Sequence, residues 1–229
     1  MLTVNTLNVI DDHIMARASY HHGRLRETLV AHGVLLLAQK GIEGLSLRTL
    51  ARKAGVSPAA PYRHFKNAQA LAEAIAAEGF TRLRSTMLAT MADPLLAGRT
   101  PLERIGMGYL SFAQRHPDHF QLMFSGRVCP DPGQPESALH QAGQAAFQAL
   151  TDTIVEAQRQ GLVAADVSPA ELAVVSWSFI HGFATLLLAG FLDPQELNPG
   201  LSQAELADAC QKLIRRGWGQ KSTPKPRRR

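Results

Sequence analysis

The sequence predicts an all-α protein, and three observations support this fold class. Apolar residues recur every three or four positions, the spacing of one helix face, as in Leu139, Ala142, Ala146, Leu150 and Ile154. No stretch alternates apolar and polar residues over the length of a strand, and the loops lack Asn-Gly or Asp-Gly hairpin pairs. Several helix starts also carry recognisable capping residues.

Three of these starts fit the capping box, in which a hydroxyl residue is followed three positions later by Glu. They are Thr100 with Glu103, Ser168 with Glu171, and Ser202 with Glu205. In the first two a Pro follows the hydroxyl residue, at the position where a helix tolerates it best. We therefore expect helices to begin after residues 100, 168 and 202.

The composition is that of a folded protein with an uneven distribution of charge. The chain has 229 residues, 45% of them hydrophobic, and a net charge of +5. It is long enough for a real hydrophobic core and too apolar for a disordered chain. Residues 1–84 carry 11 basic and 6 acidic side chains (+5), residues 85–217 carry 8 and 13 (−5), and residues 218–229 carry 5 and 0 (+5). The positive charge, which favours an anionic partner, therefore lies at the two ends.

Cysteine content and targeting signals favour the cytoplasm. Cys129 and Cys210 are too few for a disulfide scaffold or a four-cysteine zinc site, so we expect reduced thiols. The first 24 residues lack the basic and apolar regions of a signal peptide. The 21 residues 172–192 contain no Asp, Glu, Lys or Arg and could span a bilayer. They contain Ser and His and are flanked by acidic residues, so we interpret them as a central helix of a soluble protein. A membrane-anchored binding protein is the alternative.

Residues 45–66 have the layout of a helix-turn-helix. Ser46 is expected to cap a short helix, Gly55 to end it in the left-handed conformation, and Ser57 with Pro58 to begin a second short helix. Such a second helix enters the DNA major groove. An ordinary helical hairpin with solvated basic residues would have the same spacing.

The composition of the second helix suits contact with DNA. Ala59 and Ala60 are small enough for close approach, and an Ala methyl can touch a thymine methyl. Phosphate contacts, which position a helix without reading sequence, are expected from the polar side chains that follow. These are Tyr62, Arg63, His64 and Lys66.

Gly41–Lys66, with its Gly55-Val56-Ser57 turn and Tyr62-Arg63-His64-Phe65 end, strongly resembles the TetR family of transcriptional regulators. Tyr20-His21-His22-Gly23 is also similar to that family. The segment Trp177-Ser178-Phe179-Ile180-His181-Gly182 resembles the Trp-His-Gly motif of one TetR subgroup. Pro61 departs from the small or aliphatic residue of many members, and we expect it to bend the second helix.

The resemblance implies a homodimer that binds a palindromic operator, with half-sites about 34–36 Å apart. The last two long helices would pair across the dimer axis, and a ligand bound in the body would separate the DNA-binding heads. By position, Arg48 and Thr49 would contact phosphate, while Ser57, Ala59 and Ala60 would lie near bases. The expected regions are an arm (1–23), a DNA-binding domain (24–84), an effector-binding and dimerisation domain (85–217) and a disordered basic tail (218–229).

An apolar pocket in the body would hold a small apolar or amphipathic effector. The candidate lining residues are Phe112, Met123, Phe124, Phe147, Trp177 and His181, with Tyr109 nearby. Trp177 and His181 are four positions apart and share a helix face. The alternative interpretation is that these aromatic residues form an ordinary core and that His181 is a hydrogen-bonded core histidine.

We expect no metal, no cofactor and no catalysis. His116 and His119 lack a third ligand nearby in sequence, and Pro117 is more simply a helix start. A ligand-responsive repressor is the function expected. A transcriptional activator of the same fold is one alternative, and a small helical enzyme that uses His116, His119 or His181 is another.

Overall fold

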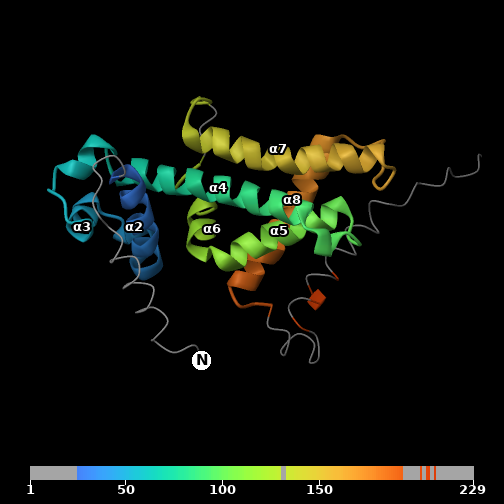
Figure 1. Cartoon of the computed structure of the whole chain (residues 1–229), viewed down its shortest axis with the longest axis horizontal. Helices are drawn as coiled ribbons and strands as arrows, with labels where there is room; N and C mark the ends of the chain where they lie inside the picture. The colour runs from blue at the N-terminus through green and yellow to red at the C-terminus, as the bar shows by residue number, and fades with distance from the viewer. Residues whose placement is uncertain (1–24, 130–132, 193–201, 203–204, 207–208, 210–229) are drawn as a thin grey trace, which may run out of the picture. The chain divides into compact units, whose positions relative to one another are not determined.

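The computed structural model describes residues 25–129, 133–192, 202, 205–206 and 209. Its helices, traced in Figure 1, follow one another in chain order without an intervening strand in this described part. They are α2 (Leu25–Lys40), η2 (Ile42–Gly44), α3 (Leu47–Lys53), η3 (Ala60–Arg63), α4 (Ala68–Ala92), η4 (Pro94–Leu96), α5 (Pro101–Arg115), α6 (Pro117–Met123), α7 (Ala138–Arg159) and α8 (Pro169–Leu188). The expected all-α class is confirmed. The expected arm 1–23 and basic tail 218–229 lie outside the described residues.

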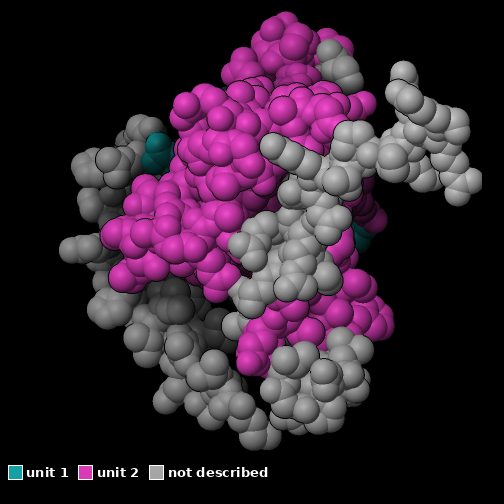
Figure 2. All heavy atoms as spheres, turned by 90° about the vertical axis from the view of Figure 1, so that its right-hand side faces the viewer, with its two compact units in different colours: residues 1–72 teal, residues 73–229 magenta. Residues whose placement is uncertain are grey.

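The chain divides into two compact units, Met1–Ala72 and Glu73–Arg229 (Figure 2). The division lies inside α4, twelve residues before the expected end of the DNA-binding domain at residue 84. Both positions fall within one continuous helix, so the sequence offers no loop or change of composition to mark the division. Each unit is described separately below.

In the first unit, α2, α3 and η3 pack around one small core. Leu29, Leu36 and Leu50 are fully buried there, and Phe65 is 3% exposed. The guanidinium of Arg26 lies over the Phe65 ring, 5.4 Å from its centroid, and adds a cation–π contact. This core holds the two short helices in place.

Both ends of α3 form as the sequence predicts. The Ser46 hydroxyl accepts a hydrogen bond from the Thr49 N–H at 3.4 Å. At the other end, Gly55 has φ +67°, which favours glycine. The Val56 N–H donates to the Ala51 carbonyl at 3.0 Å and the Gly55 N–H to the Arg52 carbonyl at 3.3 Å. These two bonds are a Schellman motif, which ends the helix sharply.

The second short helix differs from the expectation. A helix beginning at Ser57 and Pro58 is not formed, and residues 60–63 instead form the 3-10 helix η3, whose N-cap Ala59 makes no side-chain capping bond. Pro61 is the physical reason, because it has no N–H to donate to the Ser57 carbonyl four residues earlier. The Ala60 N–H takes that carbonyl at 3.0 Å, with 3-10 spacing. Pro61 thus does more than bend the helix.

In the second unit, α8 packs against both α5 and α7 (Figure 1). One buried cluster joins Ile154 and Ala157 of α7 to Leu172 and Ala173 of α8, with Val163 from the connecting segment. This cluster fixes the two long helices against each other.

Helix α5 lies very close to α4. A Cβ added at Gly108 would lie 2.6 Å from the Met87 Cα, so only glycine fits there without movement. Near the start of α5, Arg104 donates to the Leu96 carbonyl at 2.8 Å and to the Met91 carbonyl at 2.9 Å. Arg104 therefore connects the start of α5 to the end of α4 and to η4.

Two of the three expected capping boxes are present. At Thr100 the hydroxyl accepts from the Glu103 N–H at 3.3 Å, and the Glu103 carboxylate accepts from the Thr100 N–H at 2.7 Å. The same reciprocal bonds join Ser202 and Glu205. The expectation at Ser168 is wrong: its side chain makes no capping bond, although α8 does begin at Pro169. The exposed Glu171 side chain faces solvent, where water can take the place of the cap.

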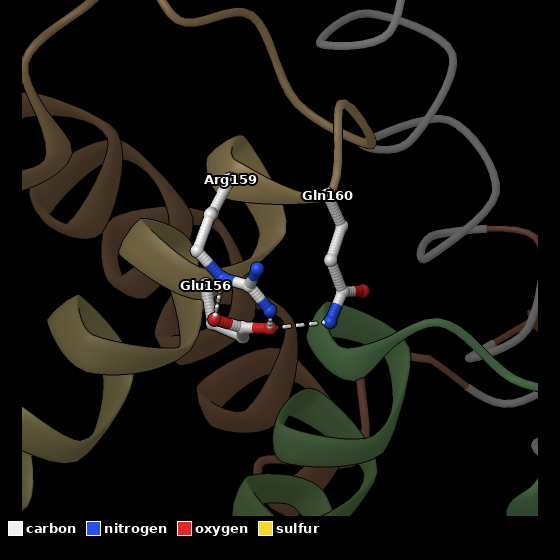
Figure 3. Close-up of polar contacts among 3 residues, drawn as sticks. All are labelled: Glu156, Arg159 and Gln160. Carbon is white, nitrogen blue, oxygen red and sulfur yellow. Dashed lines mark hydrogen bonds and ion pairs between the residues drawn. The ribbon is translucent and has the colours of Figure 1, made fainter.

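The end of α7 carries a surface cluster that Figure 3 shows. The Glu156 carboxylate accepts from Arg159 Nη2 at 2.6 Å and from Gln160 Nε2 at 2.5 Å. These bonds hold the pKa of Glu156 well below its usual value, at about 2. Gly161 follows with φ +71° and turns the chain toward α8.

Helix α8 is buried on one side only. Leu172, Ala173, Ile180 and Ala184 are buried, whereas Val174, Val175, Phe179 and Leu186 are 46–55% exposed. Among the described residues, α8 is the one helix long and apolar enough to cross a membrane. A helix at the core of a soluble protein meets the same criterion, and α8 packs on α5 and α7.

Candidate nucleic-acid interface and ligand site

The first unit presents a basic surface. Residues 45–72 contain five basic and no acidic side chains. All five are exposed, and they come from both short helices and the segment after them: Arg48, Arg52, Lys53, Arg63 and Lys66. With no carboxylate in this segment of the sequence, these side chains form a surface suited to phosphate groups.

The residues predicted to contact DNA lie mostly on this surface. Seven of them are exposed: Arg48, Ser57, Ala59, Tyr62, Arg63, His64 and Lys66. Thr49 and Ala60 are half-buried. Pro61 and Phe65 are buried and anchor η3 to the core, so the side chains between them are directed outward. Tyr62, for example, is 57% exposed although it is large and aromatic.

Arg52 is a candidate that the sequence interpretation missed. It is exposed and lines a hollow of about 500 Å³ together with Arg48, Thr49 and Pro58. The signal was available, because Arg52 lies four positions after Arg48 on a helix and shares its face. Two arginines on successive turns of α3 therefore line the same hollow as Pro58, which lies between the two short helices.

The second unit holds a polar contact among three rings from two helices. Trp177 Nε1 of α8 donates to the Tyr109 hydroxyl of α5 at 3.3 Å. The same hydroxyl lies 2.9 Å from His181 Nδ1. The His181 ring stacks on Phe120, with centroids 5.3 Å apart and planes at 27°, and meets the Phe124 ring at 4.4 Å. Tyr109 thus holds both residues of the Trp-His pair.

This group carries no charge near neutral pH. Burial raises the pKa of Tyr109, and the hydrogen bond from Trp177 opposes this only in part, so the phenol stays protonated. Burial lowers the pKa of His181, so the imidazole stays neutral. A neutral aromatic wall of this kind suits an uncharged ligand.

Two cavities lie on either side of this group. The first, of about 170 Å³, is lined mainly by the N-terminal half of α5, by residues between α7 and α8, and by Ser176, Trp177 and Ile180 of α8. The second, of about 390 Å³, is lined mainly by α4, the end of α6 and the first half of α7. Four residues line both cavities: Met87, Tyr109, Leu150 and Trp177.

The residues predicted to line the ligand site divide into two groups. Met123, Phe124, Phe147 and Trp177 line the second cavity. Phe112 and His181 line neither cavity. Phe112 is fully buried beside the His116 ring, at 5.3 Å between centroids. His181 contacts the lining residues Tyr109 and Phe124 without lining a cavity itself.

The sequence interpretation placed Tyr109 near the site but not among its lining residues, although both cavities share it. Its spacing from Ile105 and Phe112 marks it as core, and nothing local distinguishes a core tyrosine from a lining one. His140 and Gln144 of α7 also line the second cavity, where they add polar atoms to an apolar surface. The lining residues that α4, α5 and α8 contribute to the same cavity lie far from them in the sequence, so sequence spacing could not group them.

His116 and His119 adjoin each other at the start of α6, with ring centroids 5.9 Å apart. Burial lowers the pKa of both, that of His119 to about 4, so both are neutral at pH 7. In the part of the chain that the structure describes, no three His, Cys, Asp or Glu residues are grouped as metal ligands.

Comparison with known proteins agrees with this architecture. Residues 29–75 match the bacterial regulatory proteins of the tetR family, and residues 102–209 match the tetracyclin repressor-like C-terminal domain. A solved structure from Rhodococcus sp. RHA1, of unknown function, is 34% identical, with a TM-score of 0.74 over 89% of this chain and 100% of that one. The TetR family transcriptional regulator PfmR from Thermus thermophilus shares the fold, at 18% identity and a TM-score of 0.58 over 82% of this chain and 97% of that one.

A curated relative, the HTH-type transcriptional regulator YobS of Bacillus subtilis (strain 168), is 25% identical over 99 residues. That match covers 43% of this chain and about half (51%) of the relative. With both family matches, the chain belongs to the TetR family of DNA-binding transcriptional regulators, which are not enzymes. The helical-enzyme alternative is thereby excluded.

Proposed function

We propose that this regulator is a cytoplasmic repressor that binds a palindromic operator as a homodimer and releases it when a small apolar or amphipathic effector enters the second unit. The observation that carries the proposal is the pairing of two features on one chain. One is the exposed basic surface at residues 45–72, and the other is the pair of apolar cavities around Tyr109 and Trp177.

The DNA-binding part rests on exposure and charge. Phosphate contacts would come from Arg48, Tyr62, Arg63, His64 and Lys66, with Thr49 and the newly found Arg52 beside them. Ser57, Ala59 and Ala60 would lie near the bases, where small side chains permit close approach. Because η3 is a short 3-10 helix, the segment that would contact bases is short, and few base pairs per half-site would be contacted directly.

A second copy of the chain is the occupant proposed for the exposed side of α8. Val174, Val175, Phe179 and Leu186 are about half exposed, and α8 holds no Lys, Arg or Asp. Such an apolar strip favours association. In proteins that resemble this one, the last two long helices pair across the dimer axis, and α8 is the last long helix among the described residues.

The Trp-His-Gly resemblance gains a structural role in this proposal. Trp177 lines both cavities, so the first residue of the motif belongs to the wall of the proposed effector site. His181 lines neither cavity, but it contacts the Tyr109 hydroxyl and the Phe124 ring, which do. We therefore assign the C-terminal domain to that subgroup as part of the proposal.

DNA retardation on the region upstream of the chain's own gene tests the repressor function. The protein is expected to retain a fragment containing a palindrome and to release a scrambled fragment of equal length as salt is raised. Equal retention of both fragments at every salt concentration would contradict sequence-specific binding. Raised transcription from that promoter on adding protein in vitro would instead identify an activator.

Light scattering of Phe179→Glu tests the dimer. A carboxylate on the exposed side of α8 is expected to halve the measured mass, because burying an unpaired charge is unfavourable. Leu95→Glu is the matched control, since Leu95 is 90% exposed in η4, and it should leave the mass unchanged. A dimeric Phe179→Glu protein would contradict this interface.

A further inference from the structure

The two cavities of the second unit share one partition. Met87, Tyr109, Leu150 and Trp177 line both of them, so these side chains lie between the two spaces. The hydrogen bond from the Trp177 indole to the Tyr109 hydroxyl spans this partition.

We propose that the two cavities are two chambers of one site, which takes a single uncharged aromatic molecule of about three rings, and that Trp177 is the movable part of the partition. This inference rests on the proposed effector function and specifies the chemical class of the effector.

Cavity size sets the number of rings. An apolar cavity of about 150 Å³ is enough to hold benzene. The first chamber, at about 170 Å³, therefore accommodates one ring. The second, at about 390 Å³, accommodates two. A ligand that used both would have to cross the partition.

The lining residues of the two chambers disfavour an acidic ligand. Glu103 is the one Asp, Glu, Lys or Arg residue that lines either chamber. Its Oε2 atom already accepts hydrogen bonds from the N–H and the hydroxyl of Thr100, at 2.7 and 2.8 Å. Neither chamber offers a cation to an acidic ligand, so burial of a carboxylate there would be strongly unfavourable.

The hydrogen bonds identify Trp177 as the part that moves. The contact between Trp177 and Tyr109 is long, at 3.3 Å, whereas Tyr109 and His181 are 2.9 Å apart. When Trp177 turns away, the Tyr109 hydroxyl keeps His181 as its partner. Trp177 is also 37% exposed, so one side of the residue is open to solvent. Its freed indole N–H then needs an acceptor, which an oxygen atom of the ligand can supply.

A ladder of neutral ketones tests the proposal: acetophenone, 2-acetylnaphthalene and 2-acetylphenanthrene, with one, two and three rings. The full-length Trp218→Phe protein is used, because Trp177 is then the sole tryptophan and its quenching reports binding. The three-ring ketone is expected to bind one molecule per chain, about tenfold more tightly than the two-ring ketone. That is the factor for burying about 55 Å² of further apolar surface.

Two comparisons on the same protein need no further variant. Phenanthrene lacks the acceptor oxygen and is expected to bind about fivefold more weakly than 2-acetylphenanthrene, although it is the more hydrophobic molecule. Phenanthrene-2-carboxylate has a similar size and a negative charge, and its binding is expected to be at least about a hundredfold weaker.

Blocking one chamber tests whether the two act together. Gly106→Leu places a side chain in the first chamber, which Gly106 lines. It is expected to abolish the tenfold advantage of the third ring and to leave the two-ring ketone within about twofold of its original affinity. Gly98→Leu is the matched control, because an added Cβ there meets no atom within 4 Å and Gly98 lines neither chamber.

The proposal is overturned if the third ring adds no affinity, if Gly106→Leu weakens the two-ring and three-ring ketones equally, or if the carboxylate binds as tightly as the ketone. Operator release is measured separately, by DNA retardation with each ketone. If affinity rises with ring number but no ketone releases the operator, the effector function is contradicted and the two-chamber site is still supported. Release by 2-acetylnaphthalene alone would support the effector function and contradict the shared site.

Discussion

Tyr109 on α5 and His181 on α8 are joined by a hydrogen bond of 2.9 Å across 72 positions of the sequence. The Trp177 indole N–H already donates to the same phenol oxygen. The phenol has one proton of its own, which is left to be donated to Nδ1 of the neutral imidazole. One hydroxyl therefore connects α5 to two successive turns of α8.

Replacement of this hydroxyl is expected to destabilise the second unit. Tyr109→Phe leaves Nδ1 of the half-buried His181 and the Trp177 N–H without this partner, so the free energy of unfolding should fall by about 1 kcal/mol. Urea unfolding followed by circular dichroism measures this change. Tyr62→Phe, at an exposed tyrosine, should change the same quantity by less than about 0.5 kcal/mol. Equal effects of the two variants would mean that the hydrogen bonds of the Tyr109 hydroxyl add nothing to the free energy of unfolding.

His119 should make stability depend on pH. Burial, with smaller effects from Arg82 and His116, lowers the pKa of His119 to about 4 against the opposing influence of Glu78. The unfolded chain, with a pKa of about 6.5 at this residue, therefore binds a proton between pH 6.5 and 4 while the folded chain does not. Stability is fully present above pH 6.5 and is lost as the pH falls toward 4.

The expected loss from His119 is about 2 kcal/mol between pH 7 and pH 5, measured as the difference in unfolding free energy by urea titration. His119→Leu should remove this part of the pH dependence, because leucine does not titrate. His64→Gln is the control at an exposed histidine, and this variant should show the same pH dependence of the unfolding free energy as the unmodified protein. An unchanged pH dependence in His119→Leu would assign the effect to other buried histidines.

Lys66→Ala should weaken binding to operator and to unrelated DNA by about the same factor. Loss of one phosphate contact per subunit is expected to reduce the slope of log affinity against log salt by about two in a dimer. Retardation or fluorescence anisotropy at four salt concentrations gives this slope. Lys40→Ala, at the exposed end of α2 outside the basic surface, should leave it unchanged. A reduced salt slope in Lys40→Ala alone would indicate that the DNA interface lies at α2 instead.

Gly108→Ala tests the close approach of α5 to α4. The new methyl would lie 2.6 Å from the Met87 Cα and 2.5 Å from Thr90 Oγ1. Because backbone atoms must move, the unfolding free energy is expected to fall by about 1–3 kcal/mol. Gly98→Ala, where the added atom meets nothing, should be neutral within about 0.5 kcal/mol. Equal unfolding free energies of the two variants would mean that the close packing at Gly108 does not constrain the residue there.

Local features of the fold could be predicted from the sequence because their causes lie within a few residues. The Ser46 cap, the end of α3 at Gly55 and the Thr100–Glu103 capping box all depend on neighbours three or four positions apart. Pro61 shows the limit of this reasoning. Its missing N–H was evident, but whether the next turn would bend or become a 3-10 helix depends on how the core holds Pro61 and Phe65.

The ligand site could be predicted only in part. Trp177 was a candidate from its aromatic character and its position on an apolar helix, and it does line both cavities. Phe112 had the same character, yet it is fully buried outside both. Sequence spacing tells which residues are apolar and on which face they lie, but not where the packing leaves space. Tyr109 was missed as a lining residue for the same reason, since its partners are some 70 residues away.

The way η3 is held has a consequence for how this regulator can change. Only Pro61 and Phe65 fix the segment from inside, while Ala59, Tyr62, Arg63 and His64 face outward. Because the outward side chains add little to the core, their replacement is expected to leave folding almost unaffected. Under the proposed function, a substitution at Ala59 would thus change the preferred operator sequence, and substitutions at the other three positions would change the affinity for all DNA. The fold would then stay the same while the DNA sequence that the protein recognises changes.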